Sequence, residues 1–150
     1  MTDLMEKSLQ TLEFPAVLEL LAAQAVSDET KERVRNIRPS TDRGEVNLLL
    51  QETTAARKMM DIHGAPALSN LRPVAASLQR AHLGGVLNTR ELLQIASVLR
   101  TTRNVASYSG VGEEKTCIHS IFKSLTPNKY LEEKISGAIL SEDEIADNAS

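Results

Sequence analysis

The chain of 150 residues has little of several residue types on which common folds and sites depend. It contains one cysteine, which excludes an internal disulfide and any two-cysteine zinc site. Aromatic residues make up 3% of the chain and tryptophan is absent. The chain therefore lacks the aromatic stacking platform that is typical of proteins binding single-stranded nucleic acid.

The chain also lacks a hydrophobic run long enough to cross a membrane. The longest mainly apolar stretch, residues 16–26, is interrupted by Glu19 and Gln24, whereas a membrane helix needs about 20 apolar residues. The N-terminal sequence MTDLMEKSLQTLEF has acidic residues where a secretion signal has basic ones. We therefore expect a cytoplasmic protein with no membrane partner.

The residues that are present fit one soluble domain with a sizeable core. Apolar residues make up 41% of the chain, and the formal net charge is -3. This charge excludes a globally basic nucleic-acid binder, although a local basic patch is compatible with it.

Apolar residues recur at helical spacing along most of the chain, which predicts an all-α, multi-helix bundle of seven or so helices. No stretch alternates for long enough to require a strand. Residues 137–140 come closest, but they are too few to define a sheet. No internal repeat is present.

Residues that favour helix starts mark several boundaries. Pro15 suits the first turn of a helix, because its missing N–H needs no partner there. Ser27 is a good N-cap for a helix that ends before Pro39 and has Val34 and Ile37 on its inner face. A further cap is expected at Asp42.

The helix after Asp42 is expected to bury one stripe of side chains and to end at a left-handed Gly64. The stripe consists of Val46, Leu49, Leu50, Thr53, Ala56 and Met60. A shorter helix is expected between Pro73 and Gly84.

Asn88, with Glu91 three residues later, resembles a capping box and predicts the start of the next helix. The broad apolar face of that helix comprises Leu92, Ile95, Ala96, Val98, Leu99 and Ala106. Residues 107–112 are expected to form a loop. Two further helices are expected, one with Ile118, Ile121, Phe122 and Leu125 on its face, and one that begins near Tyr130 and includes Ile135.

No pattern in the sequence indicates catalysis or a metal site. The four nitrogen and sulfur candidates, His63, His82, His119 and Cys117, match no common ligand spacing. The acidic residues Glu142, Asp143, Glu144 and Asp147 lack the spacing and glycine of a calcium loop and indicate a solvated turn. Gly110 and Gly112 follow no strand, and no phosphate-binding loop or serine elbow occurs.

The middle of the chain is a basic island, because residues 70–106 contain five arginines and a single acidic residue. These arginines are the candidates for nucleic-acid contact, since a guanidinium suits phosphate. They are Arg72, Arg80, Arg90, Arg100 and Arg103. The alternative interpretation is that they are ordinary solvated or ion-paired surface positions.

Three blocks of the sequence resemble the start of the MutS-II family, the bacterial paralogues of the mismatch-repair ATPase. The blocks are LQTLEFPAVLELLAAQAVSDETKERVRNIRPSTDRGEV (residues 9–46), GGVLNTRELLQIASVLRTTR (84–103) and IADNAS (145–150). They occur in the family's order and include the R-P-S-T turn at residues 38–41 and G-G-V-L before a capped helix.

The resemblance implies a helical, non-catalytic N-terminal part of the MutS core. Residues 1–136 would form this core domain, and residues 137–150 would connect it to lever helices that the chain does not contain. ATP and Mg²⁺ would bind in the parent's ATPase domain, and most members also carry a nuclease domain. The family is described as dimeric, as binding branched DNA, as restraining recombination, and in some cases as acting on stalled ribosomes.

The resemblance leaves two functions open for the chain itself, besides an independent enzyme for which no site is found. The first is a scaffold that contributes some phosphate contacts. The second is a protein-interaction module, docking on the rest of its own chain, a second subunit or the ribosome through apolar helix faces. The chain ends on residues that favour helix starts, so we expect it to be a fragment of a longer protein.

Overall fold

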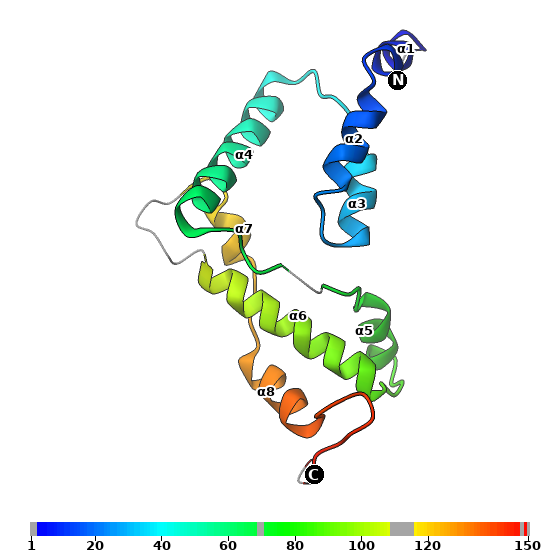
Figure 1. The fold of residues 1–150 in the computed structure, drawn as a ribbon, viewed down its shortest axis with the longest axis vertical. Coiled ribbons are helices and arrows are strands. Elements are labelled where there is room, and N and C mark those ends of the chain that lie inside the picture. Colours follow the sequence, from blue (N-terminus) through cyan, green and yellow to red (C-terminus); the bar gives the residue numbers. More distant parts are fainter. Residues whose placement is uncertain (1–2, 69–70, 109–115, 148, 150) are drawn as a thin grey trace. The chain divides into compact units, whose positions relative to one another are not determined.

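The computed structural model describes residues 3–68, 71–108, 116–147 and 149 (Figure 1). Within these residues the fold is all-α, as the apolar spacing predicts. It has eight helices, and its one β-interaction is an isolated bridge between Ile139 and Ile145. The chain divides after Ser40 into two compact units. No helix in the described part is both long and apolar enough to cross a membrane.

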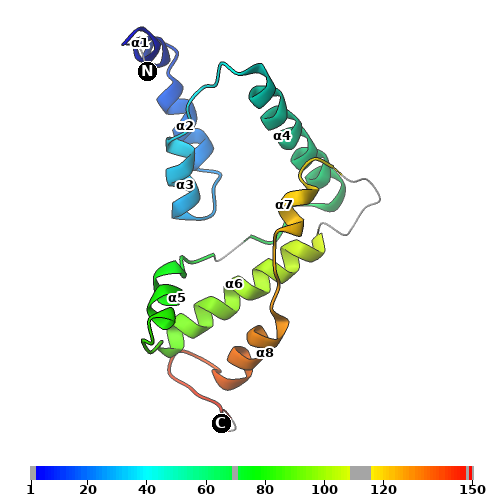
Figure 2. The same ribbon diagram turned by 180° about the vertical axis from the view of Figure 1, so that it is seen from behind.

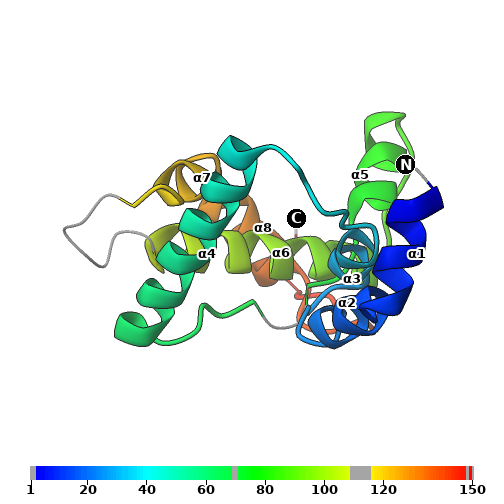
Figure 3. The same cartoon turned by 90° about the horizontal axis from the view of Figure 1, so that it is seen from above.

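The first unit contains three helices, of which α2 packs against the other two (Figure 3). They are α1 (Asp3–Thr11), α2 (Phe14–Ala22) and α3 (Asp28–Arg35). Leu18 and Ala22 of α2 are buried, and the Arg35 guanidinium of α3 donates to both carboxylate oxygens of Glu19 at 2.8 and 3.2 Å. The unit is therefore held by a small apolar contact and one bidentate ion pair.

The predicted boundaries in this unit agree with the structure, including a helix that ends before Pro39, but the predicted place of one side chain is wrong. Pro15 lies in the first turn of α2, and the Ser27 hydroxyl accepts a hydrogen bond from the Thr30 amide at 3.2 Å. Ile37, however, lies beyond the end of α3 and is 43% exposed. The helix stops two residues earlier than its apolar pattern, so Ile37 never joins an inner face.

The second unit contains the five remaining helices (Figures 1 and 2). It also contains the larger apolar cluster. They are α4 (Arg43–His63), α5 (Ala75–His82), α6 (Thr89–Tyr108), α7 (His119–Lys123) and α8 (Lys129–Ala138). Ile95 and Ala96 of α6 are buried against Ile135 of α8 and Ile139. Leu92 and Leu99 pack partly buried around them, which confirms the core of the face predicted for α6.

The helix α4 begins where predicted but does not bury the predicted stripe. The Asp42 carboxylate accepts the Glu45 amide at 3.0 Å and caps the helix. Ala55, which is outside the stripe, is the buried residue of α4. Leu49, Leu50 and Met60 of the stripe are 52%, 60% and 46% exposed. The spacing identified a helix correctly but could not identify which of its sides finds a neighbour.

Two glycines end helices with positive φ. Gly84 follows α5 with φ of 83°, as a helix-ending glycine does. Gly64 follows α4 with φ of 77°, but its ψ of 177° is extended, so the predicted left-handed conformation is wrong in this angle. The Gly64 carbonyl instead accepts a hydrogen bond from the Tyr108 hydroxyl at 2.7 Å, which holds the end of α4 to the end of α6.

Near the C-terminus one helix, α7, is shorter than predicted. Ile118 is buried, but α7 is five residues long and Ile121 is 54% exposed, so the predicted single face is wrong at this position. The predicted boundary at 136/137 falls inside α8, which continues to Ala138. The loop prediction for residues 107–112 is wrong at residues 107–108, which are helical, and residues 109–112 lie outside the described residues.

Candidate functional site

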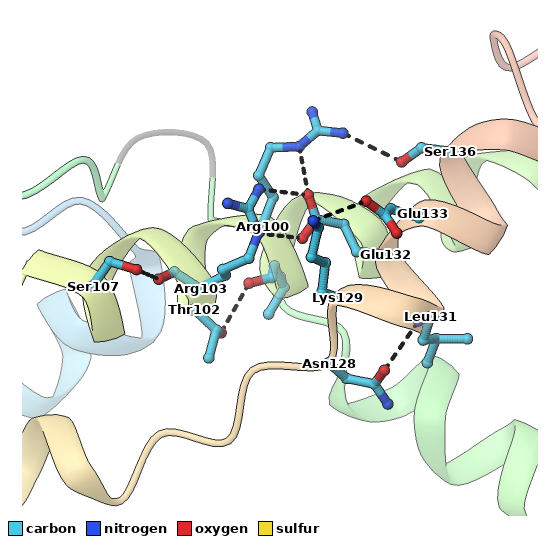
Figure 4. Close-up of polar contacts among 11 residues, drawn as sticks. Arg100, Thr102, Arg103, Ser107, Asn128, Lys129, Leu131, Glu132, Glu133 and Ser136 are labelled. Atoms are coloured by element: carbon cyan, nitrogen blue, oxygen red, sulfur yellow. Dashed lines mark hydrogen bonds and ion pairs between the residues drawn. The ribbon is translucent and has the colours of Figure 1, made fainter.

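Charged side chains gather where α6 meets α8, around the single carboxylate of Glu132 (Figure 4). The Arg100 Nε atom donates to Glu132 Oε1 at 3.1 Å. Arg103 donates through Nε to Oε2 and through Nη2 to Oε1, both at 2.9 Å. Arg100 also reaches the Ser136 hydroxyl at 3.3 Å. Since residues three apart share one face of a helix, Arg100 and Arg103 can grip one carboxylate together.

Glu132 is 5% exposed and is the buried charged residue of the described chain. A buried carboxylate is costly unless it is paired and hydrogen-bonded, and the two guanidinium groups meet this requirement. The hydrogen bonds from Arg103 are the main cause that lowers the pKa of Glu132 from 4.5 to about 2, against the opposing effect of burial. The same contact raises the pKa of Arg103. Glu132 therefore stays ionised at physiological pH.

A second cluster joins α5 to the start of α6. The Asn88 side chain accepts the Glu91 amide at 2.9 Å, and the Asn88 amide donates to the Glu91 carboxylate at 3.0 Å, which confirms the predicted capping box. The Arg80 guanidinium pairs with the same carboxylate, and the Ser77 hydroxyl contacts it at 3.0 Å. These contacts, the Asn88 amide foremost, lower the pKa of Glu91.

The last two candidate arginines are more open to solvent. Arg90 of α6 lies 3.5 Å from Glu142, and the two side chains are 67% and 58% exposed. The Thr89 hydroxyl also donates to the Glu142 backbone carbonyl at 2.6 Å. Arg72 precedes α5 and is exposed.

The structure thus places four of the five candidate arginines against carboxylates of their own chain. Arg100 and Arg103 are brought together, whereas Arg80 and Arg90 contact different acidic residues. Contact with nucleic acid stays a prediction for all five. The four paired arginines are compatible with the alternative that the sequence left open, which is that of ion-paired surface positions.

Glu132 is a key residue that the sequence analysis did not single out. It lies three residues before Ile135 on one face of α8, and Ile139, four residues further on, follows directly after the helix. Two features of the sequence could have predicted this role. Glu132 is an acidic residue on an apolar face, and two arginines three residues apart occur elsewhere in the chain.

The candidate metal ligands do not assemble. In the part of the chain that the structure describes, no three His, Cys, Asp or Glu residues are placed to hold a metal ion. His63 contacts the edge of the Tyr108 ring, with 6.2 Å between ring centroids, and Cys117 is exposed. Gly110 and Gly112 lie outside the described residues.

The fold and the charged clusters define an all-α region whose arginines join helices to one another. Its sequence is 38% identical over 149 residues to a protein named Endonuclease MutS2 from Acetivibrio thermocellus. The identity is 37% over 148 residues to the protein of that name from Ruminiclostridium cellulolyticum, and 33% over 149 residues to that from Clostridioides difficile. Each match covers 97% of this chain and 19% of the relative.

Over nearly its whole length the chain is therefore related to a region of the MutS2 proteins, as the sequence blocks indicated. It spans about a fifth of the length of the curated relatives that it matches. No protein-family profile matches the chain. No solved structure matches it.

Proposed function

We propose that this chain is a non-catalytic, N-terminal scaffold domain of a cytoplasmic, MutS2-type DNA-binding endonuclease and ATPase. The observation that carries the proposal is the junction at Glu132, where two arginines of α6 hold α8 in place. In this proposal, the residues that bind ATP and Mg²⁺ and cleave DNA belong to the parts of the parent outside the matched fifth. The parent would use the scaffold in restraining recombination or in acting on stalled ribosomes.

The absence of catalysis can be tested directly on the purified chain. ATP hydrolysis and nicking of branched and duplex DNA are measured with Mg²⁺ present. We expect neither reaction to exceed the rate without protein. An activity that stays with the chain through further purification, at constant specific activity, would contradict the proposal.

We further propose that phosphate contacts, on branched DNA or ribosomal RNA, begin at Arg72 and Arg90. Arg72 is exposed and the Arg90 side chain is 67% exposed, so both can reach a phosphate without breaking a buried pair. The side chains of Arg80, Arg100 and Arg103 are 49%, 55% and 37% exposed. They can add to the positive potential of this surface while they remain in their ion pairs.

This contact is tested by fluorescence anisotropy with branched DNA, duplex DNA and structured RNA over a salt series. The Arg72→Ala/Arg90→Ala variant should bind more weakly and lose about two units of salt slope on duplex DNA. Lys58→Ala/Lys123→Ala is the control, since it removes the same charge from exposed positions outside the basic island. Equal weakening in both variants, or no binding of the unaltered chain at low salt, would overturn the contact.

A second candidate function, a protein-interaction module, is favoured by the apolar side chains exposed on α4. Apolar docking persists as salt rises, whereas phosphate binding weakens steeply. The salt series therefore separates the two functions.

A further inference from the structure

The stripe on α4, of which Val46 and Ala56 are half-buried and the rest is exposed, repeats with the seven-residue period of a coiled coil. Its central residues are spaced by three, four, three and four positions, which are the a and d positions of two heptads and the a position that follows them. They are Val46, Leu49, Thr53, Ala56 and Met60, and we call them the heptad face. Two of its large apolar side chains, Leu49 and Met60, are about half exposed at 52% and 46%.

The polar member of the heptad face is already satisfied inside its own helix. The Thr53 hydroxyl donates to the Leu49 carbonyl at 2.8 Å. Because this hydroxyl needs no outside partner, Thr53 can enter an apolar seam without leaving a hydrogen bond unmade. The whole face is thus compatible with burial against a second helix.

The charges beside the heptad face select the partner and its direction. Glu52 occupies a g position and Arg57 an e position. In a parallel pair of identical helices, a g residue lies opposite the e residue five positions later in the other helix. Glu52 would therefore face Arg57 of the second copy, twice across the pair. An antiparallel pair would instead bring g toward g and set Glu52 near a second Glu52.

The contact that Arg57 makes within its own chain does not oppose this arrangement. Arg57 lies 4.0 Å from Asp61, and the two side chains are 85% and 69% exposed. An exposed pair at this distance is weak and easily exchanged for another.

We propose that the heptad face of α4 binds the same face of a second copy of this chain, as a parallel two-stranded coiled coil. The inference rests on the face and its charges and is independent of the nucleic-acid contacts proposed above. Because two heptads make a short seam, the association is expected to be weak and concentration-dependent.

The apolar part of the proposal is tested by sedimentation equilibrium from micromolar to millimolar concentration. Leu49→Ala should weaken association at least about tenfold, because one leucine is lost from each side of the seam. Leu48→Ala is the matched control, since Leu48 is 51% exposed but lies off the heptad face. It should leave association unchanged, and circular dichroism checks that both variants keep their helix content.

The charged part is tested by exchange of signs. Glu52→Lys and Arg57→Glu should each weaken self-association roughly tenfold, because each replaces two attractive pairs by two repulsive ones. An equimolar mixture of the two variants should regain association, since position 52 of each chain then faces the opposite charge at position 57 of the other chain.

Three results would overturn the proposal. They are a chain that stays monomeric up to millimolar concentration, equal effects of Leu48→Ala and Leu49→Ala, and a mixture that associates no better than its components. The first result would assign the heptad face to a different occupant.

Discussion

Glu132 connects two helices through a single carboxylate, so its chemistry is best tested at the residue scale. Glu132→Gln keeps the size of the side chain but leaves Arg100 and Arg103 without their buried anion. Glu133→Gln is the matched control, because Glu133 is 64% exposed and its ion pair is with Lys129, at 3.4 Å. We expect the melting temperature to fall by several degrees for Glu132→Gln and to change little for Glu133→Gln. Equal melting temperatures in the two variants would show that the buried pair contributes nothing to stability.

The same residue gives the chain a pH dependence. The pKa of Glu132 is lowered from 4.5 to about 2 in the folded chain. A carboxyl group whose pKa is lowered by folding stabilises the folded state fully at any pH above its pKa in the unfolded chain. This stabilisation is lost as the pH falls through its pKa in the folded chain. We therefore expect the stability of the unaltered chain to decline between pH 4.5 and 2.

The variant Glu132→Gln should decline less over this range. Its stability should still depend on pH in part, because two other carboxyl groups have lowered pKa values. The Arg35 side chain is the main cause for the pKa of Glu19, and the Asn88 amide is the main cause for that of Glu91. Thermal melts of both proteins from pH 7 to pH 2 make the comparison. Parallel curves at every pH would contradict the assignment to Glu132.

At the scale of elements, the start of α6 depends on Asn88. Asn88→Ala removes the acceptor of the Glu91 amide and should cost about 1 kcal/mol of stability. Asn88→Ser keeps an acceptor oxygen and should recover most of this loss. Urea denaturation measures both, and a serine variant as unstable as the alanine variant would show that the cap is not the cause.

Two glycines in the second unit should respond to alanine in opposite ways. A Cβ atom at Gly85 would lie 2.6 Å from Arg80 Cγ and 2.9 Å from the Arg80 carbonyl oxygen, so Gly85→Ala forces the backbone to shift. A Cβ at Gly137 in α8 meets nothing within 4 Å. We expect Gly85→Ala to destabilise the chain and Gly137→Ala to stabilise it by roughly 0.5 kcal/mol. Thermal melts of the two variants decide the signs.

The elements also show how far the sequence alone could lead. The three predicted helix caps are confirmed at Ser27, Asp42 and Asn88. A cap is a contact between residues three apart, so it can be predicted from the local sequence. Burial is a tertiary property, so the spacing of Leu49 and Met60 predicted a face without showing that it would stay exposed. The role of Glu132 could not be predicted for the same reason, since its partners lie 29 and 32 residues away in the sequence.

For the whole molecule, the division after Ser40 makes a prediction about cleavage. Residues 38–42 lie between α3 and α4, outside any helix, and most of them are exposed. A protease of broad specificity should cut there before it cuts inside α6 or α8, because helices resist local opening. Mass spectrometry of early time points identifies the sites, and a first cut within α6 or α8 would contradict the division into two units.

The shared use of Glu132 by two arginines also restricts how this junction could change during evolution. Replacing all three side chains by well-packed apolar ones is often tolerated in proteins, whereas removing one member of a buried charged group is costly. Each single mutational step away from the cluster therefore lowers stability, even where the final apolar core would be sound. Because substitutions arise one at a time, selection for stability removes each intermediate. The cluster can therefore persist for this reason alone, with no benefit to DNA binding or catalysis.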